Sequence, residues 1–420
     1  MKKQLLFFIT LILFSYGGFS QSILKGKVIS EDSKLPLPSV SVYINSTSLG
    51  TITNEQGQFI ISRIPPGKFR LVATCVGYET WSDLIDLHSL PTDFTISLKT
   101  KGEELEAFSV SPPDPDGWEK YGKYFKLILI GTTPNSNDCK LMNPEIVKFR
   151  LNKDNTLVAF AREPLQVTNY ELGYEIKYKL EEFEVNLDNG LVNYSGYAFY
   201  KDLAISHPKR AVKYEKARLN TYLGSLLHFM RAFYANDLTV QGFEMHSLAK
   251  IVNPEKERAK EMFRIYGNKP ITSETKSQIG FEVSTTGVPV HLRTTNSNID
   301  STDYFKKALK QPDSLISHEL ISSDSIGFAV DSTIAGLYFP DSLEVSYKLK
   351  DTPPRYKSLS KENKKETYPI SQFVFVHRTS VFVLNNGFYY KPGNLKITGY
   401  WAWYENMSTW LPFDYQPGKK

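Results

Sequence analysis

Residues 26–79 read GKVISEDSKLPLPSVSVYINSTSLGTITNEQGQFIISRIPPGKFRLVATCVGYE, and this stretch decides the fold of the front of the chain. Apolar and polar side chains alternate over residues 40–44, with the two-residue period of a half-buried strand. Turn-forming residues at 54–57 and 65–67 separate this run from the next ones. Short strands at such regular spacing predict a β-sandwich over residues 22–99.

The glycines, prolines and strand residues of this module also resemble a known family when they are taken as a set. The matching residues are Gly26, Val28, Pro38, Val40, Val42, Ile44, Gly50, Thr51, Thr53, Asn54, Gly57, Phe59, Pro66, Gly67, Gly77 and Tyr78. They resemble the carboxypeptidase regulatory-like domain, a transthyretin-like β-sandwich common at the front of exported Bacteroidetes proteins. The resemblance implies an interaction or stabilising module, and it carries no catalytic residues with it.

Residues 1–20 have the pattern of a secretory signal. Two lysines precede an apolar run over residues 5–14, which is shorter than the roughly 20 residues of a membrane-spanning helix. Small residues at Gly18 and Ser20 predict cleavage after Ser20, which leaves Gln21 first. Because no later stretch is long and apolar enough, no transmembrane segment is expected in the mature chain. We therefore expect an exported protein in the periplasm, or associated with the outer membrane at the cell surface.

The amino-acid composition narrows the class of fold and the kinds of partner further. The 420 residues include 25 Tyr and 26 Phe against 6 Met, which favours strands because aromatic side chains suit a pleated, half-buried surface. A formal net charge of +5 on so long a chain gives no basic surface for nucleic acid, and no nucleic-acid partner is expected. The two cysteines, Cys75 and Cys139, cannot form a disulfide framework, and a single bridge between them stays open.

Behind a charged and then Pro/Asp-rich linker at residues 100–117, residues 118–420 predict a larger β-rich domain of α+β type. Alternating runs at 147–151, 157–161, 174–185 and 192–200 are followed by one long helix at about 209–235. Further strand-like runs include 279–283, 343–349, 373–377 and 395–403. Motifs within 224–232 and 399–415 resemble the region that follows this module in uncharacterised Bacteroidetes proteins, which implies no activity. The predicted fold class is mainly β with one long helix.

The spacing of the histidines and serines bears on catalysis. None of the seven histidines has the His-Glu-x-x-His or His-x-x-Glu spacing of a zinc peptidase, and no Gly-x-Ser-x-Gly elbow occurs. No metal and no cofactor is therefore expected. Spacing alone cannot identify a pair of carboxylates for glycoside hydrolysis. The aromatic run at 400–404 fits either a sugar-stacking platform or a core strand.

The helix at 209–235 carries the candidate binding residues. Leu226 lies near the centre of an apolar stripe, while Ser225, His228 and Arg231 lie on the other face. These three polar residues are candidates for binding an anionic ligand, with Gly224 allowing close approach. The alternative is that Gly224 packs against a strand while His228 and Arg231 hold neighbouring loops.

The function that these observations favour is an exported, non-catalytic envelope protein with a binding or structural role. The expected partner is an unidentified envelope protein or a glycan. The alternative is a hydrolase of unrecognised type with its site beside the helix. A pocket lined by His228, Arg231 and carboxylates would favour the hydrolase, whereas a helix buried on both faces would favour the binding role.

Overall fold

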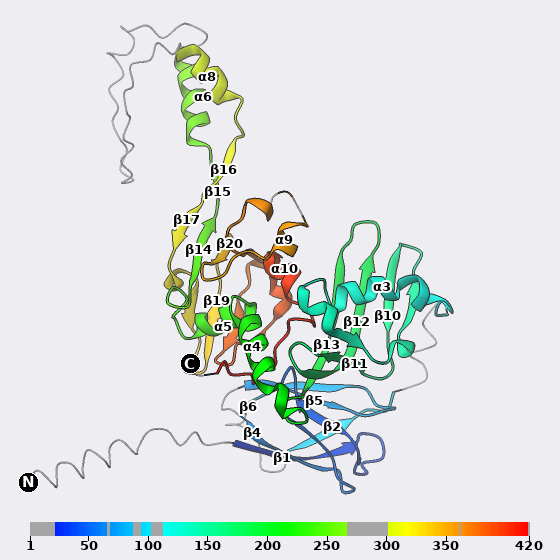
Figure 1. Cartoon of the computed structure of the whole chain (residues 1–420). Helices are drawn as coiled ribbons and strands as arrows, with labels where there is room; N and C mark the ends of the chain where they lie inside the picture. The colour runs from blue at the N-terminus through cyan, green and yellow to red at the C-terminus, as the bar shows by residue number, and fades with distance from the viewer. Residues whose placement is uncertain are drawn as a thin grey trace, which may run out of the picture.

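The computed structural model describes residues 22–64, 68–86, 94–101, 112–266, 301–359, 361 and 363–418. The predicted signal at 1–20, most of the predicted linker and the predicted strand at 279–283 lie outside these residues. Figure 1 shows a body built from several sheets, with the N-terminal sheets at its base. No helix in the described part of the chain is long and apolar enough to cross a membrane.

The N-terminal module is a β-sandwich, as its sequence predicts. One sheet has the order β4-β1-β7 and the other the order β3-β2-β5-β6. Their strands are β1 (Ser22–Ser30), β2 (Ser41–Ile44), β3 (Gly50–Ile52), β4 (Gln58–Ile64), β5 (Lys68–Thr74), β6 (Trp81–Asp86) and β7 (Thr95–Leu98). Burial alternates along β1, most of β4 and β7, and Val28, Leu71 and Ile96 are fully buried in the core of the sandwich.

The middle of the chain forms a six-stranded antiparallel sheet covered by a helix. The sheet has the order β8-β11-β12-β10-β9, and β13 pairs with β12. Its strands are β8 (Cys139–Leu141), β9 (Lys148–Leu151), β10 (Thr156–Phe160), β11 (Leu165–Asn169), β12 (Tyr174–Asn186) and β13 (Val192–Asp202). Helix α3 (Gly117–Leu129) packs on the sheet through Phe125, whose ring centroid lies 4.8 Å from that of Phe183.

The C-terminal part contains two further antiparallel sheets. One has the order β17-β14-β20-β21-β24 and the other the order β18-β19-β22-β23. Their strands are β14 (Phe243–Leu248), β17 (Glu319–Ile321), β18 (Gly327–Ala329), β19 (Ile334–Leu337), β20 (Ser342–Tyr347), β21 (Ile370–Phe375), β22 (Val381–Leu384), β23 (Tyr389–Tyr390) and β24 (Leu395–Gly399). A short helix α9 (Pro354–Lys357) follows β20. Phe229, Phe373 and Trp401 pack together in the core of this part.

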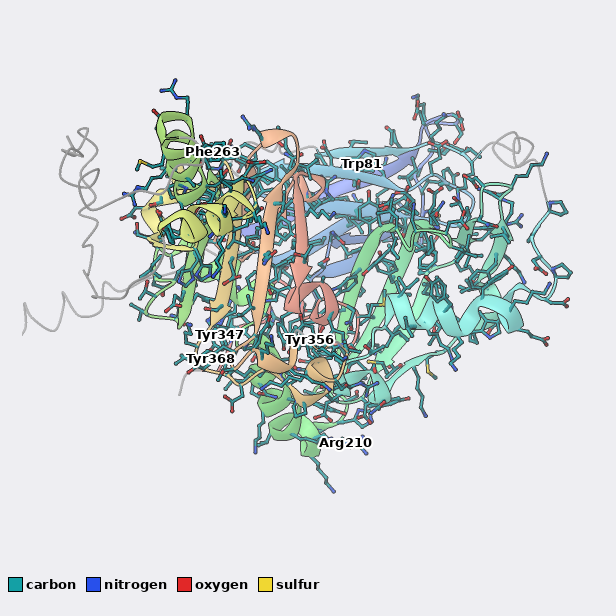
Figure 2. All side chains as sticks on the ribbon, turned by 90° about the horizontal axis from the view of Figure 1, so that it is seen from above. Trp81, Arg210, Phe263, Tyr347, Tyr356 and Tyr368 are labelled. Carbon is teal, nitrogen blue, oxygen red and sulfur yellow. The ribbon has the colours of Figure 1, made fainter. Side chains whose placement is uncertain are left out.

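An arm projects from the five-stranded sheet, as Figure 1 shows. It consists of the two-stranded ribbon β15 (Lys250–Val252) and β16 (Ser314–Ile316), with α6 (Pro254–Tyr266) and α8 (Ser301–Leu309) beyond it. Figure 2 places Phe263 of α6 on the opposite side of the molecule from α3. The arm thus leaves the sheet after β14 and returns to it before β17.

The predicted single helix at 209–235 is wrong, because the structure has two helices there. They are α4 (Ala211–Tyr222) and α5 (Leu226–Tyr234). Leu223 is extended and Gly224 has a φ of +80°, which breaks the helical hydrogen bonding. A Cβ atom on Gly224 would lie 2.6 Å from the Tyr347 ring, so glycine is required both by conformation and by space.

The aromatic run at 400–404 is also not a strand. β24 ends at Gly399, whose φ of +74° turns the chain into the short helix α10 (Tyr400–Tyr404). Tyr400, Trp401 and Tyr404 are buried. The run therefore packs in the core as the second alternative predicted, but as a helix rather than a strand, and it does not form an exposed sugar-stacking platform.

The sandwich contacts the rest of the chain through the turn after β2. Ser46 donates its N–H to the Ala198 carbonyl at 2.7 Å, and Tyr200 donates to the Thr47 carbonyl at 2.9 Å. Phe413 donates to the Ser46 carbonyl at 2.7 Å. One turn of the sandwich is thus joined to β13 and to the C-terminal segment at once.

The structure has no disulfide bond between Cys75 and Cys139. Cys75 and Cys139 are both free thiols, one following β5 and the other beginning β8. Burial raises the pKa of Cys139 to about 12, which keeps its thiol protonated and unreactive.

Candidate functional site

A cavity of about 450 Å³ lies where the middle sheet, α5, β23 and the C-terminal segment meet. Its position follows from the fold, because β12 and β13 supply one wall and the first turn of α5 supplies another. Aromatic side chains make up much of the lining, namely Tyr178, Tyr194, Tyr200, Tyr389, Trp410 and Phe413. Polar groups are few and include Ser225, Thr409 and Glu405. The cavity therefore combines an aromatic lining with a small number of hydrogen-bonding groups.

Glu405 is the charged group of this cavity. It follows α10, and its Oε1 accepts the backbone N–H of Leu226, the first residue of α5, at 2.8 Å. Burial raises the pKa of the carboxyl group from 4.5 to about 7, although the Leu226 N–H opposes this increase. Near neutral pH the carboxyl group therefore exists in both protonation states and can either donate or accept a hydrogen bond.

The aromatic lining is held in place by contacts among its own rings. Trp410 contacts two tyrosines, with ring centroids 6.1 Å from Tyr178 and 6.5 Å from Tyr194. The Trp410 and Tyr194 rings are nearly parallel, at an interplanar angle of 26°. Burial raises the pKa of Tyr194 to about 12, so its hydroxyl stays protonated at neutral pH. These rings offer a rigid, flat apolar surface.

Of the three predicted binding residues, Ser225 alone lines the cavity. It is the N-cap of α5, where its Oγ accepts the backbone N–H of His228 at 3.1 Å. That hydrogen bond fixes the first turn of the helix beside Glu405. Ser225 therefore positions the cavity wall as well as contributing a hydroxyl group to it.

His228 lies in the core and is only 2 % exposed. Its Nδ1 accepts the backbone N–H of Gly224 at 3.1 Å, and its Nε2 lies 3.2 Å from Oε1 of Gln241. The ring packs between Tyr222 and Phe243, at centroid distances of 4.7 and 4.9 Å. Burial lowers the pKa of His228, which favours the neutral ring. His228 thus holds the Gly224 turn and does not reach the cavity.

Arg231 binds backbone carbonyls from two distant segments. Its Nε donates to the Asn386 carbonyl at 2.9 Å, and its Nη2 donates to the carbonyls of Phe413 and Tyr415 at 3.1 and 2.9 Å. The guanidinium group also lies over the ring of Tyr222, at 5.4 Å from its centroid. Arg231 thereby holds the C-terminal segment against α5, which is the loop-holding role stated as the alternative. Whether any of the three predicted residues binds a ligand stays a prediction.

Sequence reasoning missed Glu405 because it is one of 45 acidic residues and belongs to no motif. The sequence did contain one signal, because Glu405 directly follows the aromatic run at 400–404. Where such a run packs in the core, the adjacent carboxyl group also lies in an apolar environment. It also missed a cluster of His246, His318 and Glu344, whose possible ligand atoms all lie within 4.8 Å of one another. These residues come from separate strands and turns, so a search for local spacing could not bring them together.

Comparison with known proteins identifies the front of the chain. Residues 24–110 match the family model of the CarboxypepD_reg-like domain. The chain carries a carboxypeptidase regulatory-like domain. The match confirms the family that the sequence resembles, and it continues past residue 99 into the predicted linker. A β-rich region follows the carboxypeptidase regulatory-like domain.

The remaining comparisons give distant similarities. No curated protein matches the sequence. A type II cohesin–X-dockerin complex from Acetivibrio cellulolyticus is 21% identical over 18% of this chain and 51% of that one, with a TM-score of 0.15. The chain thus spans about half the length of that protein. A protein of unknown function from Bacteroides fragilis is 10% identical over 90% of this chain and 94% of that one, with a TM-score of 0.16.

Proposed function

We propose that this chain is an exported, non-catalytic binding protein of the bacterial cell envelope, and that the cavity beside α5 is its ligand site. One observation carries the proposal. A cavity of about 450 Å³ with an aromatic lining and one carboxyl group falls in the size range of small-ligand sites, about 300–1,000 Å³. The carboxypeptidase regulatory-like domain, which brings no catalytic residues, fits this role.

The ligand class that suits this lining is a short glycan segment. Flat rings such as Trp410 and Tyr194 offer apolar surface to the C–H faces of a sugar ring, while Glu405, Ser225 and Thr409 offer hydrogen bonds to hydroxyl groups. A protein partner is less well accommodated, because the site is a concave cavity rather than an extended surface. We therefore propose an envelope glycan fragment as the ligand.

A hydrolase remains the second candidate because of Glu405. A carboxyl group with a pKa of about 7 has the property required of a general acid at neutral pH. Hydrolysis of a glycoside requires a second carboxyl group facing the first one. Among the described residues that line the cavity, Glu405 is the one carboxylic acid, and no histidine joins it. In addition, both Leu226 and His228 of α5 are buried, which favours the binding role.

Calorimetric titration of the mature chain with a panel of soluble glycan fragments from the envelope tests this proposal. Glu405→Gln and Trp410→Ala should weaken binding of the fragment that the unmodified protein binds, because each removes one kind of contact. Tyr124→Ala, which removes an exposed ring on α3, is the matched control and should bind normally. Binding that is unchanged in both cavity variants, or binding of no fragment, contradicts the proposal. Cleavage of a bound fragment would favour the hydrolase.

Export is tested separately. Mass spectrometry of the protein from fractionated cells should find it in the envelope fraction with Gln21 as its first residue. Recovery of an intact residue 1–20 segment from the cytoplasmic fraction would contradict export.

A further inference from the structure

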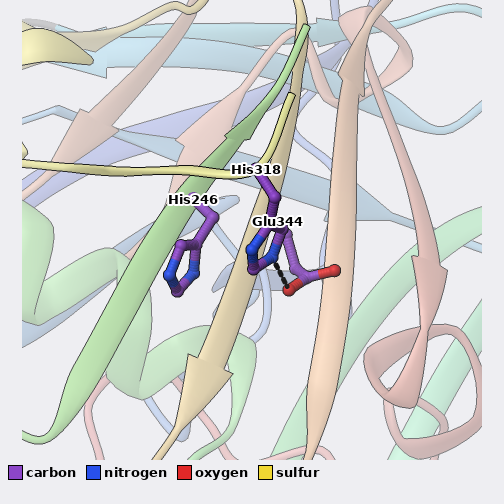
Figure 3. Close-up of side chains that lie close together, drawn as sticks. All are labelled: His246, His318 and Glu344. Atoms are coloured by element: carbon purple, nitrogen blue, oxygen red, sulfur yellow. Dashed lines mark hydrogen bonds and ion pairs between the residues drawn. The ribbon is translucent and has the colours of Figure 1, made fainter. Parts of the chain in front are cut away.

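Two histidines and a glutamate meet on the face of the five-stranded sheet that carries its polar side chains. His246 on β14 and Glu344 on β20 are directly opposite each other in the antiparallel register. His318, in the turn between β16 and β17, places its Nε2 2.9 Å from Oε1 of Glu344. Its ring lies parallel to that of His246, with centroids 4.1 Å apart. Figure 3 shows the three side chains on adjacent segments.

We propose that His246, His318 and Glu344 bind one divalent transition-metal ion at the base of the arm. Two imidazole nitrogens with one carboxylate oxygen form a ligand set that suits zinc and its first-row neighbours. All three candidate ligand atoms already lie within 4.8 Å of one another, so side-chain rotation without backbone movement can bring them to a common centre. The prediction of no metal rested on local sequence spacing, which does not detect ligands brought together by strand pairing.

One ring nitrogen of His246 has no hydrogen-bond partner in the described part of the protein, which points to a bound ligand. Its side chain is 17% exposed, and its Nδ1 is buried without a hydrogen-bond partner. An unpaired buried polar atom of this kind costs free energy unless something binds it. On the other side of the ring, Nε2 lies 3.8 Å from Oε1 of Glu244, which in turn pairs with Lys348 at 2.8 Å. A separation of 3.8 Å is too long for a hydrogen bond, so Glu244 does not satisfy the His246 ring.

His318 is the ligand that has to move. A metal ion lies in the plane of the imidazole ring that binds it, so two parallel stacked rings cannot share one ion as they stand. The His318 side chain is 52% exposed and is free to rotate out of the stack. Its hydrogen bond with Glu344 would then be replaced by bonds from both groups to the ion.

Metal binding here would join both ends of the arm to β20. His246 lies in the last part of β14 before the arm begins at Lys250, and His318 follows β16, where the arm ends. In the described residues between these strands, Ser317 donates a backbone hydrogen bond to the Ala249 carbonyl at 2.8 Å. A metal ion would add a side-chain link to the backbone pairing of β14 with β17 and of β15 with β16. The site lies apart from the aromatic cavity and does not depend on the function proposed for it.

Calorimetric titration of the full mature chain with zinc chloride tests the site. The protein should be produced without a polyhistidine tag and freed of metal by a chelator. We expect one zinc ion per chain, and an increase in the thermal unfolding midpoint that the chelator reverses. His318→Ala and Glu344→Gln should each weaken binding at least about tenfold, since even partners behind the ligands contribute 10–100-fold. His318 is exposed, so its replacement leaves the metal-free fold unchanged.

His207→Ala, which removes a histidine from the turn before α4, is the matched control and should bind zinc normally. Failure of the unmodified protein to bind stoichiometric zinc overturns the proposal. Binding that survives in both ligand variants overturns it as well, as does an equal loss in His207→Ala.

Discussion

The Glu405 carboxylate accepts the backbone N–H of Leu226 at 2.8 Å, across 179 residues of sequence. The free N–H groups at the first turn of a helix favour a negative charge, so Glu405 stabilises the start of α5 when it is ionised. The same carboxyl group lines the cavity. Protonation of a single side chain therefore affects both the α5 terminus and the proposed ligand site.

The first prediction concerns the pH dependence of stability at Glu405. Its pKa rises from 4.5 to about 7 on folding, so between these values the folded protein binds a proton that the unfolded chain does not bind. The free energy of unfolding should therefore fall as pH increases from about 4.5 to 7, by at most about 3 kcal/mol. Glu405→Gln should remove this fall. Urea denaturation of both proteins at several pH values measures the difference, and identical pH profiles would contradict it.

The second prediction compares His228 with Leu226. His228→Ala should destabilise the protein by about 2–4 kcal/mol, because it leaves a core cavity and two unpaired polar groups. Leu226 borders an existing cavity. Leu226→Ala should therefore lower the free energy of unfolding by an amount in the lower part of the range of about 2–5 kcal/mol. Because His228 is buried and its ring nitrogens contact Gly224 and Gln241, its replacement should cost at least as much as that of Leu226. Urea denaturation midpoints give both values.

His228 also has a pH signature of its own. Its pKa is lowered in the folded state by burial, so below about pH 6.5 the unfolded chain takes up a proton that the folded protein does not. The stability that depends on the neutral ring is present above this value and is lost as pH falls. His228→Ala should lose this acid sensitivity, and a variant that keeps the full acid sensitivity would contradict the assignment.

The third prediction concerns the break between α4 and α5. Gly224 and Gly190 have similar positive φ values of +80° and +70°, but an added Cβ meets the Tyr347 ring only at Gly224. Gly190→Ala should cost about 1–2 kcal/mol from backbone strain alone. Gly224→Ala should cost more, because the ring must also move. Thermal unfolding of the pair separates the two effects, and equal losses would show that the ring adjusts freely.

The fourth prediction concerns the N-terminal module, for which we propose the boundary at residues 22–99. Its core is formed by its own strands, so the isolated segment should unfold cooperatively. It should be only modestly stable, because a domain of fewer than about 80 residues buries little apolar surface and the contacts of Ser46 and Thr47 are lost. Circular dichroism during urea denaturation is the measurement. A gradual, non-cooperative loss of structure would show that the boundary is misplaced.

Local patterns account for the parts of the fold that the sequence predicted well. The sandwich strands alternate, and turns with Gly57 and Asn54 fix their connections, so neighbouring residues carry most of the information. In the middle sheet, Asn155 and Gly190 take a positive φ in the short turns between β9 and β10 and between β12 and β13. In contrast, the helix break at Gly224 depends on Tyr347, a residue far away in the sequence. Helical periodicity alone could not reveal it.

The residues of the candidate sites also differ in whether neighbouring or distant parts of the sequence determine them. Ser225 was chosen for its place on the polar face of a predicted continuous helix, and only the structure shows that it caps α5. Glu405 reaches Leu226 only after the C-terminal segment folds back over α5. The sequence by itself determined a β-sandwich followed by a β-rich region, because strand alternation and turn chemistry depend on adjacent residues. The resemblance of this sandwich to the carboxypeptidase regulatory-like domain was also visible in the sequence. Only the tertiary structure decided which side chains are buried and which meet, such as His246 with Glu344. The physical reason is that strand pairing and burial depend on residues far apart in the chain, and these interactions have no fixed spacing in sequence.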